Sequence, residues 1–250
     1  MKLQVLILML VATSAFSATP TDTTVAFYHG APDRAGNYLV PSLTWRSAGA
    51  VRRDQMFDGR VEGDIYGQPL YWRPPGAERS LIIAATESDF VYALDAATGR
   101  IMWRTTLGDP VARAALSCGN IVPLGITGTP VIDAACGALY LDAMINDRGM
   151  PRHLVYGLRL ADGSVLPGFP MGVAAGLAER GIRFTPAAQN QRGGLWCNQG
   201  RPMVMLDSQR GEVCHGPAEA PGRVVRGATL RPRGHPAMRA VVSSVQAQLA

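Results

Sequence analysis

Three oxygen-bearing side chains stand close together in the middle of the chain. Asp142, Asn146 and Asp147 fall within six residues, and carboxylate and amide oxygens are what Ca²⁺ prefers, with about six to eight ligands per ion. Their spacing does not match the loop of an EF-hand. We therefore expect polar residues at the end of a hairpin rather than a calcium site. Glu62 and Asp64, which flank a glycine, are interpreted in the same way as rim residues.

The histidines and cysteines are scattered along the chain. The sequence contains no HExxH, HxH, CxxC or GxSxG spacing, so it carries no signature of a zinc protease, a zinc ribbon or a serine hydrolase. The histidines are His29, His153, His215 and His235. The cysteines are Cys118, Cys136, Cys197 and Cys214. In an oxidising compartment they could form up to two disulfides, and three connectivities stay open.

Lysine chemistry is excluded from the mature protein. Lys2 is the only lysine, and it precedes the apolar run 3–11 and the small residues Ala15 and Ser17, which together predict a signal peptide over 1–17. That apolar run is too short for a membrane span, which needs about 20 residues. Without a lysine amine there is no P-loop clamp and no Schiff base with pyridoxal phosphate.

The elements that must position these residues repeat along the chain. The first unit has short apolar runs at 67–72, 80–85, 90–95 and 101–103. The second has them at 128–133, 137–143, 153–158 and 164–166. The two openings are 61 residues apart, and the turn glycines Gly99 and Gly163 are 64 apart. Runs rich in Val, Ile, Leu and Tyr between Gly, Asp and Thr turns predict antiparallel meanders, which a propeller stacks around an axis.

The turn of the first unit carries a recognisable motif. Residues 91–103 read Val-Tyr-Ala-Leu-Asp-Ala-Ala-Thr-Gly-Arg-Ile-Met-Trp and resemble the signature of PQQ-repeat (quinoprotein) propellers, Ala-x-Asp-x-x-Thr-Gly followed by tryptophan. Its five positions are met by Ala93, Asp95, Thr98, Gly99 and Trp103. The resemblance implies that Trp103 packs between neighbouring blades and that Asp95 stabilises the turn. The second unit departs from the motif, with Arg159 in place of Asp95 and Pro167 in place of Trp103.

A wider resemblance covers about residues 28–195, two-thirds of the chain. Residues 68–72, 118–120 and 189–193 are similar to segments of exported PQQ-like propeller proteins. Catalytic members hold PQQ and Ca²⁺ on the propeller axis, and alcohol-oxidising members stack a disulfide of adjacent cysteines on the quinone. No two cysteines are adjacent here, so we predict no cofactor and lean away from enzyme activity.

The segment 104–127 separates the two units and exceeds an ordinary connection of about four to six residues. It carries Cys118, Asn120 and Pro123. Long loops on propellers often carry function. Two interpretations stay open: a binding loop, or a plain insertion tied down by a disulfide from Cys118.

The last third of the chain differs in composition. Residues 18–175 contain 13 Arg and 15 acidic residues, whereas residues 176–250 contain 10 Arg and 4 acidic residues. No Phe, Tyr or Trp occurs after Trp196. We interpret 196–250 as an atypical basic tail, disordered or shifted in reading frame, rather than as a nucleic-acid-binding segment.

These observations predict an all-β, antiparallel propeller of PQQ-repeat type over 18–195. A unit of roughly 60 residues leaves room for about three or four blades, so we expect an incomplete ring. The predicted function is a non-enzymatic binding or scaffold module in the periplasm or outside the cell, with another protein completing the propeller. The alternative is a fragment of a PQQ- and metal-dependent oxidoreductase. The sequence predicts no membrane span and no nucleic-acid partner, and it does not identify a ligand.

Overall fold

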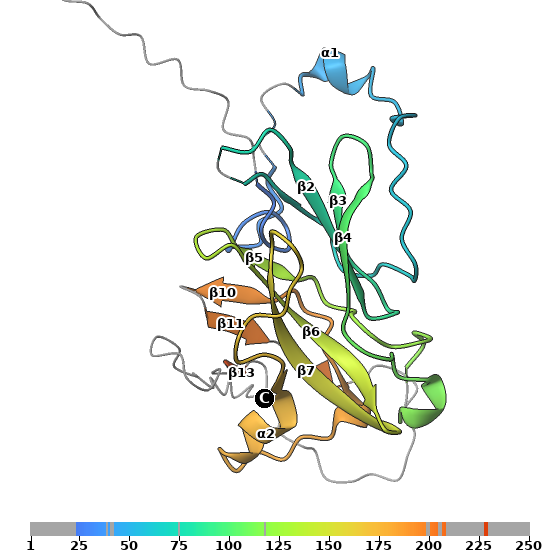
Figure 1. Cartoon of the computed structure of the whole chain (residues 1–250), viewed down its shortest axis with the longest axis vertical. Coiled ribbons are helices and arrows are strands. Elements are labelled where there is room, and N and C mark those ends of the chain that lie inside the picture. The colour runs from blue at the N-terminus through green and yellow to red at the C-terminus, as the bar shows by residue number, and fades with distance from the viewer. Residues whose placement is uncertain are drawn as a thin grey trace, which may run out of the picture.

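Two four-stranded antiparallel sheets form the centre of the computed structural model (Figure 1). The structure describes residues 24–38, 40, 43–74, 76–117, 119–198, 201–204, 207–208 and 228–229. The predicted signal peptide lies outside the described residues. Within them, no helix is long and apolar enough to cross a membrane.

The first sheet, here called blade 1, is a simple meander. It consists of β1 (Leu70–Trp72), β2 (Leu81–Ala85), β3 (Phe90–Asp95) and β4 (Ile101–Thr106), in that order. The register places Leu70 opposite Ile83, Ile83 opposite Ala93 and Ala93 opposite Trp103. All four side chains of this row are buried, so one face of the blade is continuously apolar.

The second sheet, blade 2, repeats the meander. It consists of β5 (Val131–Asp133), β6 (Ala138–Asp147), β7 (Met150–Arg159) and β8 (Met171–Gly172). Its face toward blade 1 presents Ile132, Leu139 and Leu158, which share one apolar core with the row of blade 1. The opposite face packs on α2 (Val173–Ala178), whose Val173 and Leu177 are fully buried.

The N-terminal part of the described chain joins the first strands of the two blades. Val25 exchanges two backbone hydrogen bonds with Tyr71 of β1, at 2.8 and 3.1 Å. The next carbonyl, that of Ala26, accepts a hydrogen bond from Ile132 N of β5 at 2.9 Å. Both blades are therefore fastened to one short segment as well as to each other.

The same hairpin closes both repeat units. Gly99 N donates to Asp95 O, and Gly163 N donates to Arg159 O, each at 2.8 Å. Both glycines have positive φ, +77° and +73°, which a side chain rarely adopts. In the first unit Asp95 Oδ1 accepts hydrogen bonds from Ala97 N, Thr98 N and Thr98 Oγ1. In the second unit Asp162 Oδ1 accepts from Ser164 instead.

Trp103 extends from the last strand of blade 1 to this second hairpin. Its Nε1 donates to Leu160 O at 2.9 Å, and its side chain is 9% exposed. A Cβ added to Gly163 would lie 2.6 Å from Trp103 Cε3, so only glycine leaves room for the indole. Thr105 Oγ1 donates to Gly163 O at 2.7 Å beside it. The tryptophan of one repeat thus packs on the glycine turn of the next.

The described residues of the segment 104–127 pack on blade 2. Val111 and Leu124 exchange backbone hydrogen bonds of 2.8 and 2.9 Å, and the 3₁₀ turn η1 (Arg113–Ala115) lies between them. Val111 and Leu124 pack with Met144 of β6 in a separate apolar cluster. Cys118 lies outside the described residues, so its disulfide stays a prediction.

Strands continue past residue 195. β10 (Trp196–Asn198), β11 (Arg201–Val204) and β13 (Ala228–Thr229) form a three-stranded antiparallel sheet. β12 (Asp207–Ser208) pairs with β9 (Gln189–Asn190), which follows the 3₁₀ turn η2 (Pro186–Ala188). The predicted division of the chain at residue 195 stays a prediction. The remainder of 196–250 lies outside the described residues, and its interpretation stays a prediction.

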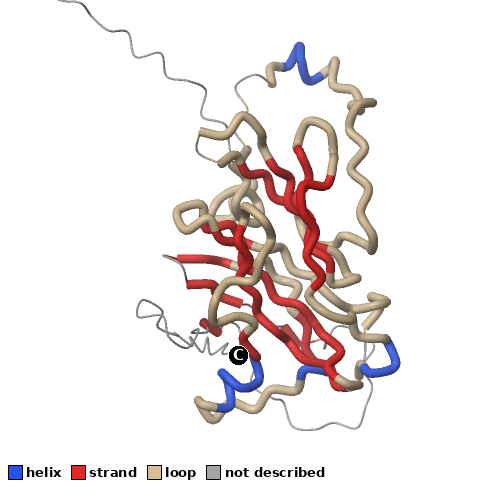
Figure 2. Tube along the Cα trace, in the orientation of Figure 1, coloured by secondary structure: helices blue, strands red, loops and turns tan. Residues whose placement is uncertain are grey.

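The predicted all-β, antiparallel fold class is confirmed, whereas its PQQ-repeat type stays a prediction. The described residues are arranged mainly in antiparallel β sheets, the two principal ones are successive blades, and their sheets do not close into a ring (Figure 2).

Replacing Trp103 by alanine should lower the free energy of unfolding by about 3–5 kcal/mol, because it leaves a cavity between the blades. Trp103→Phe keeps much of the packing but loses the hydrogen bond to Leu160 O. Loss of that bond should lower the free energy of unfolding by about 1 kcal/mol, in addition to the effect of the smaller ring. Trp45 is 97% exposed, and Trp45→Ala is the matched control, expected to change stability by less than about 0.5 kcal/mol. Urea denaturation measures all three. Equal effects of the Trp103 and Trp45 variants on stability would contradict the packing of Trp103 between the two blades.

Candidate functional site

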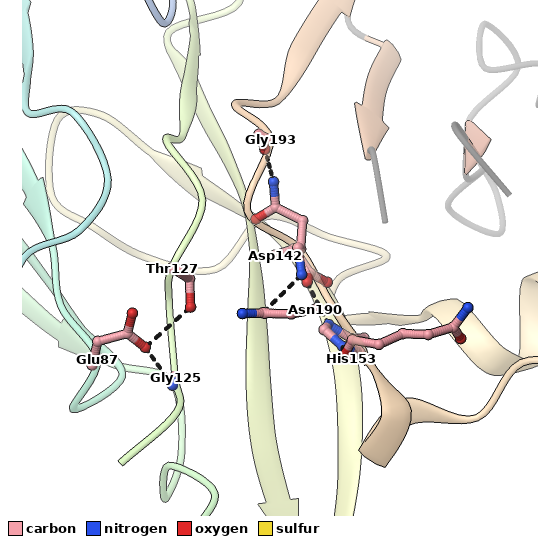
Figure 3. Close-up of polar contacts among 9 residues, drawn as sticks. Glu87, Gly125, Thr127, Asp142, His153, Asn190 and Gly193 are labelled. Atoms are coloured by element: carbon pink, nitrogen blue, oxygen red, sulfur yellow. Dashed lines mark hydrogen bonds and ion pairs between the residues drawn. The ribbon is translucent and has the colours of Figure 1, made fainter. Parts of the chain in front are cut away.

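Buried polar side chains gather where the two blades meet the end of the insertion. The β2–β3 turn of blade 1 supplies Glu87 and Asp89, and strands β6 and β7 of blade 2 supply Asp142 and His153. Their side chains are 0 to 2% exposed. We call these four residues the polar cluster, and Figure 3 shows all of them except Asp89.

Glu87 binds the strand-like end of the insertion. Its Oε2 accepts hydrogen bonds from Gly125 N at 2.7 Å and from Thr127 Oγ1 at 3.2 Å (Figure 3). A Cβ added to Gly125 would lie 2.7 Å from Asp89 Oδ1 and still closer to Glu87 O. The insertion approaches the β2–β3 turn this closely because position 125 is glycine.

Asp142 and His153 form a buried pair across the β6–β7 hairpin. His153 Nδ1 lies 2.6 Å from Asp142 Oδ2, and Nε2 lies 3.0 Å from Gln189 O. A carbonyl can only accept, so Nε2 carries a proton. A second proton is then shared between Nδ1 and the carboxylate. The ring of Phe184 meets the imidazole edge-on at 5.6 Å and closes the outer side.

Several oxygens of this region have no hydrogen-bond partner among the described residues. Four of them belong to carboxyl groups of the polar cluster: both oxygens of Asp89, Oε1 of Glu87 and Oδ1 of Asp142. Thr86 Oγ1 and Gln191 Oε1 share this property. A buried charge without a partner is costly, so carboxyl groups in such surroundings take up protons.

The pKa values follow from this burial. Burial, reinforced by the charges of Glu87, Asp142 and Asp109, raises the pKa of Asp89 to about 9. Burial also raises the pKa of Glu87, although its hydrogen bonds to Gly125 and Thr127 oppose the shift. Burial raises the pKa of Asp142 more than His153 lowers it. Burial disfavours the His153 imidazolium, but the charge and hydrogen bond of Asp142, together with the hydrogen bond to Gln189 O, outweigh burial and raise the pKa of His153. At neutral pH Asp89 is therefore a neutral carboxylic acid.

The residues of the polar cluster do not provide a metal cage. Their orphaned oxygens have the right chemistry for Ca²⁺, but nowhere in the described ranges do three His, Cys, Asp or Glu side chains converge as a metal site requires. The expectation that the chain binds no PQQ and no Ca²⁺ stays a prediction. The carboxyl groups of the polar cluster bind protons more tightly than free carboxyl groups do, and they lie at the contact between the two blades.

The calcium candidates of the sequence do not come together. Asp142 is buried in mid-strand, whereas Asn146 and Asp147 lie at the tip of the β6–β7 hairpin. A strand rises about 3.3 Å per residue, so four residues separate Asp142 from Asn146 by roughly 13 Å. Asn146 Oδ1 accepts from Gly149 N at 2.9 Å, and Asp147 pairs with Arg152 at 3.0 Å. Both tip residues have the structural roles expected of a hairpin end.

The remaining candidates are dispersed. Glu62 and Asp64 are exposed at the rim of blade 1, where Asp64 O accepts from Glu87 N at 2.9 Å. His29 is partly exposed, stacks on Tyr28 and contacts Arg34 O through Nδ1 at 3.2 Å. His215, His235 and Cys214 lie outside the described residues.

Sequence reasoning missed Glu87, Asp89 and the pairing of His153. Glu87 and Asp89 sit in the hydrophilic break Thr-Glu-Ser-Asp between two apolar runs, which is typical of an exposed turn. Only the approach of the insertion buries that turn. A glycine at 125 is a weak hint of such an approach, and nothing in the sequence marks its partner.

The chain has little similarity to known proteins in sequence or in structure. No family model and no curated protein matches the chain. Among solved structures, the crystal structure of BamB from Moraxella catarrhalis is similar, with 18% sequence identity and a TM-score of 0.31. The match covers 63% of this chain and 38% of the BamB chain. The aligned part of this chain thus spans well under half the length of that protein.

Stability should fall as pH rises from about 4 to about 9. The pKa of Asp89 is raised to about 9, so over this range the folded state holds a proton that the unfolded state has released. The raised pKa values of Glu87, Asp142 and His153 act in the same direction. Asp89→Asn mimics the protonated acid and should flatten this dependence. Melting temperatures at several pH values between 5 and 9 measure it.

Asp162→Asn is the matched control. Hydrogen bonds from Ser164 lower the pKa of the exposed Asp162, so between pH 5 and pH 9 this carboxyl is ionised in both states and its removal should leave the slope unchanged. A wild-type protein equally stable at pH 5 and pH 9 would contradict the assignment.

Proposed function

We propose that this chain is an exported, non-enzymatic binding or scaffold module built of PQQ-type propeller blades. The blade assignment is supported by the first repeat, where Asp95 accepts three hydrogen bonds in the turn and Trp103 packs on the next blade. The open arrangement of the sheets supports a partner that continues the ring.

The observation that carries the binding function is an apolar arm on the outside of blade 1. We define the arm as residues 43–66, which include the short helix α1 (Trp45–Ala48). It exposes large apolar side chains: Leu43 54%, Trp45 97%, Val51 62%, Met56 80%, Ile65 41% and Tyr66 53%. Monomeric proteins rarely expose apolar side chains in such number on one segment unless a partner covers them.

The arm is attached at one end and free of the sheet at the other. Asp58 N donates to Thr98 O at 3.0 Å, and a Cβ at Gly59 would contact Leu94. These contacts hold the part around residues 57–59 on the β3–β4 hairpin. In Figure 1 the part around α1 stands away from both blades. Its aromatic and aliphatic side chains suit an apolar groove on a protein partner.

The periplasm or cell exterior is the proposed location, supported by the signal-like residues 1–17. The partner is proposed to be a protein rather than a nucleic acid or a lipid bilayer. Aromatic and methionine side chains at the arm are the types enriched at protein interfaces.

Site-specific photo-cross-linking in the native host tests the binding function. A photoreactive amino acid at position 56 should give a cross-linked adduct of defined size, because Met56 lies on the arm. The same amino acid at position 150 is the control, since Met150 is also an exposed methionine, 56% exposed, on blade 2. Adducts at neither position, or equally at both, would contradict a binding role for the arm.

The oxidoreductase alternative has its own test. The purified full chain, supplied with PQQ and Ca²⁺, should show no dye-coupled oxidation of alcohols or aldose sugars above the rate of the same mixture without protein. A known PQQ dehydrogenase assayed in parallel shows that the cofactor is competent. Turnover well above background would overturn the non-enzymatic proposal.

A further inference from the structure

Two cysteines that are distant in sequence meet at one carboxylate in this fold. Cys136 lies in the turn between β5 and β6, and Cys197 lies in the middle of β10. Cys197 Sγ donates to Asp133 Oδ2 at 3.6 Å. Cys136 reaches the same carboxylate through its backbone, because Cys136 N donates to Asp133 Oδ1 at 3.2 Å. The two cysteines therefore share a single carboxylate group as a hydrogen-bond partner.

Backbone contacts hold the two segments together independently of these thiols. β10 lies beside β5 (Figure 1). Just before β10, Leu195 N donates to Thr129 O at 2.9 Å, and Leu195 is buried against Val131 and Tyr140 of blade 2. Asp133 Oδ1 in turn fixes the turn that carries Cys136 by accepting from Ala135 N and Cys136 N at 3.1 and 3.2 Å. Both cysteines are thus placed by ordered neighbours.

From this geometry we propose that Cys136 and Cys197 form a disulfide that fastens β10 and its sheet to blade 2. The two residues are not joined in the structure. In the reaction each thiol loses its hydrogen, one S–S bond forms, and the two electrons reduce an external disulfide to two thiols. Cys136 is exposed and Cys197 is partly exposed, so an external disulfide can reach the pair.

The carboxylate controls when the bond forms. Burial, together with the charge and hydrogen bond of Asp133, raises the pKa of the Cys136 thiol. The thiolate is the species that attacks a disulfide, so a raised pKa slows the reaction at neutral pH. Asp133→Asn keeps the acceptor oxygen for the turn and removes the charge. This variant should oxidise several-fold faster than the wild type.

The proposed bond closes a long loop of the chain. It would link residues on either side of β6, β7, β8 and α2, and cross-links across long loops restrict the unfolded chain most. Formation of the disulfide in the cell rests on the proposed function, because it requires the oxidising compartment to which the chain is proposed to be exported. Its test in solution does not depend on export or on a partner, so either proposal can fail without the other.

Peptide mapping identifies the bond directly. A protease that cleaves before aspartate places the four cysteines in four peptides, 109–132, 133–141, 162–206 and 207–250. The full chain is reduced, equilibrated with oxidised glutathione, alkylated and digested without reductant. We expect 133–141 linked to 162–206, and the link lost after reduction. A link from 133–141 to either other cysteine peptide, or both peptides alkylated, would overturn the proposal.

A pair of variants separates a specific bond from general thiol reactivity. The double variant Cys118→Ser/Cys214→Ser retains only Cys136 and Cys197. After equilibration with oxidised glutathione, this variant should contain no alkylatable thiol and no bound glutathione. Adding Cys197→Ser leaves Cys136 alone, which should end as a mixed disulfide. Reduction should lower the melting temperature of the first variant by roughly 5 °C or more and not change the second. Two mixed disulfides in the first variant would contradict the pairing.

Discussion

The packing of Trp103 against the turn of the next repeat is the interaction on which this fold depends. A four-stranded meander is too small to bury both of its faces. The indole, with its bond to Leu160 O, joins the apolar row of blade 1 to that of blade 2 and makes one core from two sheets. The turn it meets must contain glycine, because any Cβ at Gly163 would collide with the ring. The tryptophan of one repeat therefore requires the glycine in the turn of the next repeat.

Joining the blades creates the polar cluster. The β2–β3 turn of blade 1 carries carboxylates that would be solvated in an isolated hairpin. In the assembled protein they face Gly125 and β6 with almost no exposure. Like charges in such a space cannot all be ionised, so Asp89 is neutral while Asp142 shares a proton with His153. The contact between the repeats thus brings together carboxyl groups that bind protons more tightly in the folded protein.

The polar and apolar surfaces of the molecule have different roles. The polar cluster is buried, whereas the arm 43–66 presents its apolar side chains to solvent. The side of blade 2 away from blade 1 is covered by α2 and by the residues before β10. The proposed partner would contact the arm beside blade 1, and the proposed Cys136–Cys197 bond would secure the opposite side.

The sequence by itself determined the repeat, the strand positions and the turn residues, because each depends on local chemistry. Alternating apolar runs specify strands, Gly99 and Gly163 adopt positive φ, and Asp95 caps its own hairpin within three residues. The hairpin role of Asn146 and Asp147 was predictable for the same reason. The tertiary structure alone decided the burial of Glu87 and Asp89, the contact of the Asp142–His153 pair with Gln189 O, and the meeting of Cys136 with Cys197 at Asp133. Those contacts join residues from separate elements, and their positions follow from how the blades and the insertion pack, which no local pattern records.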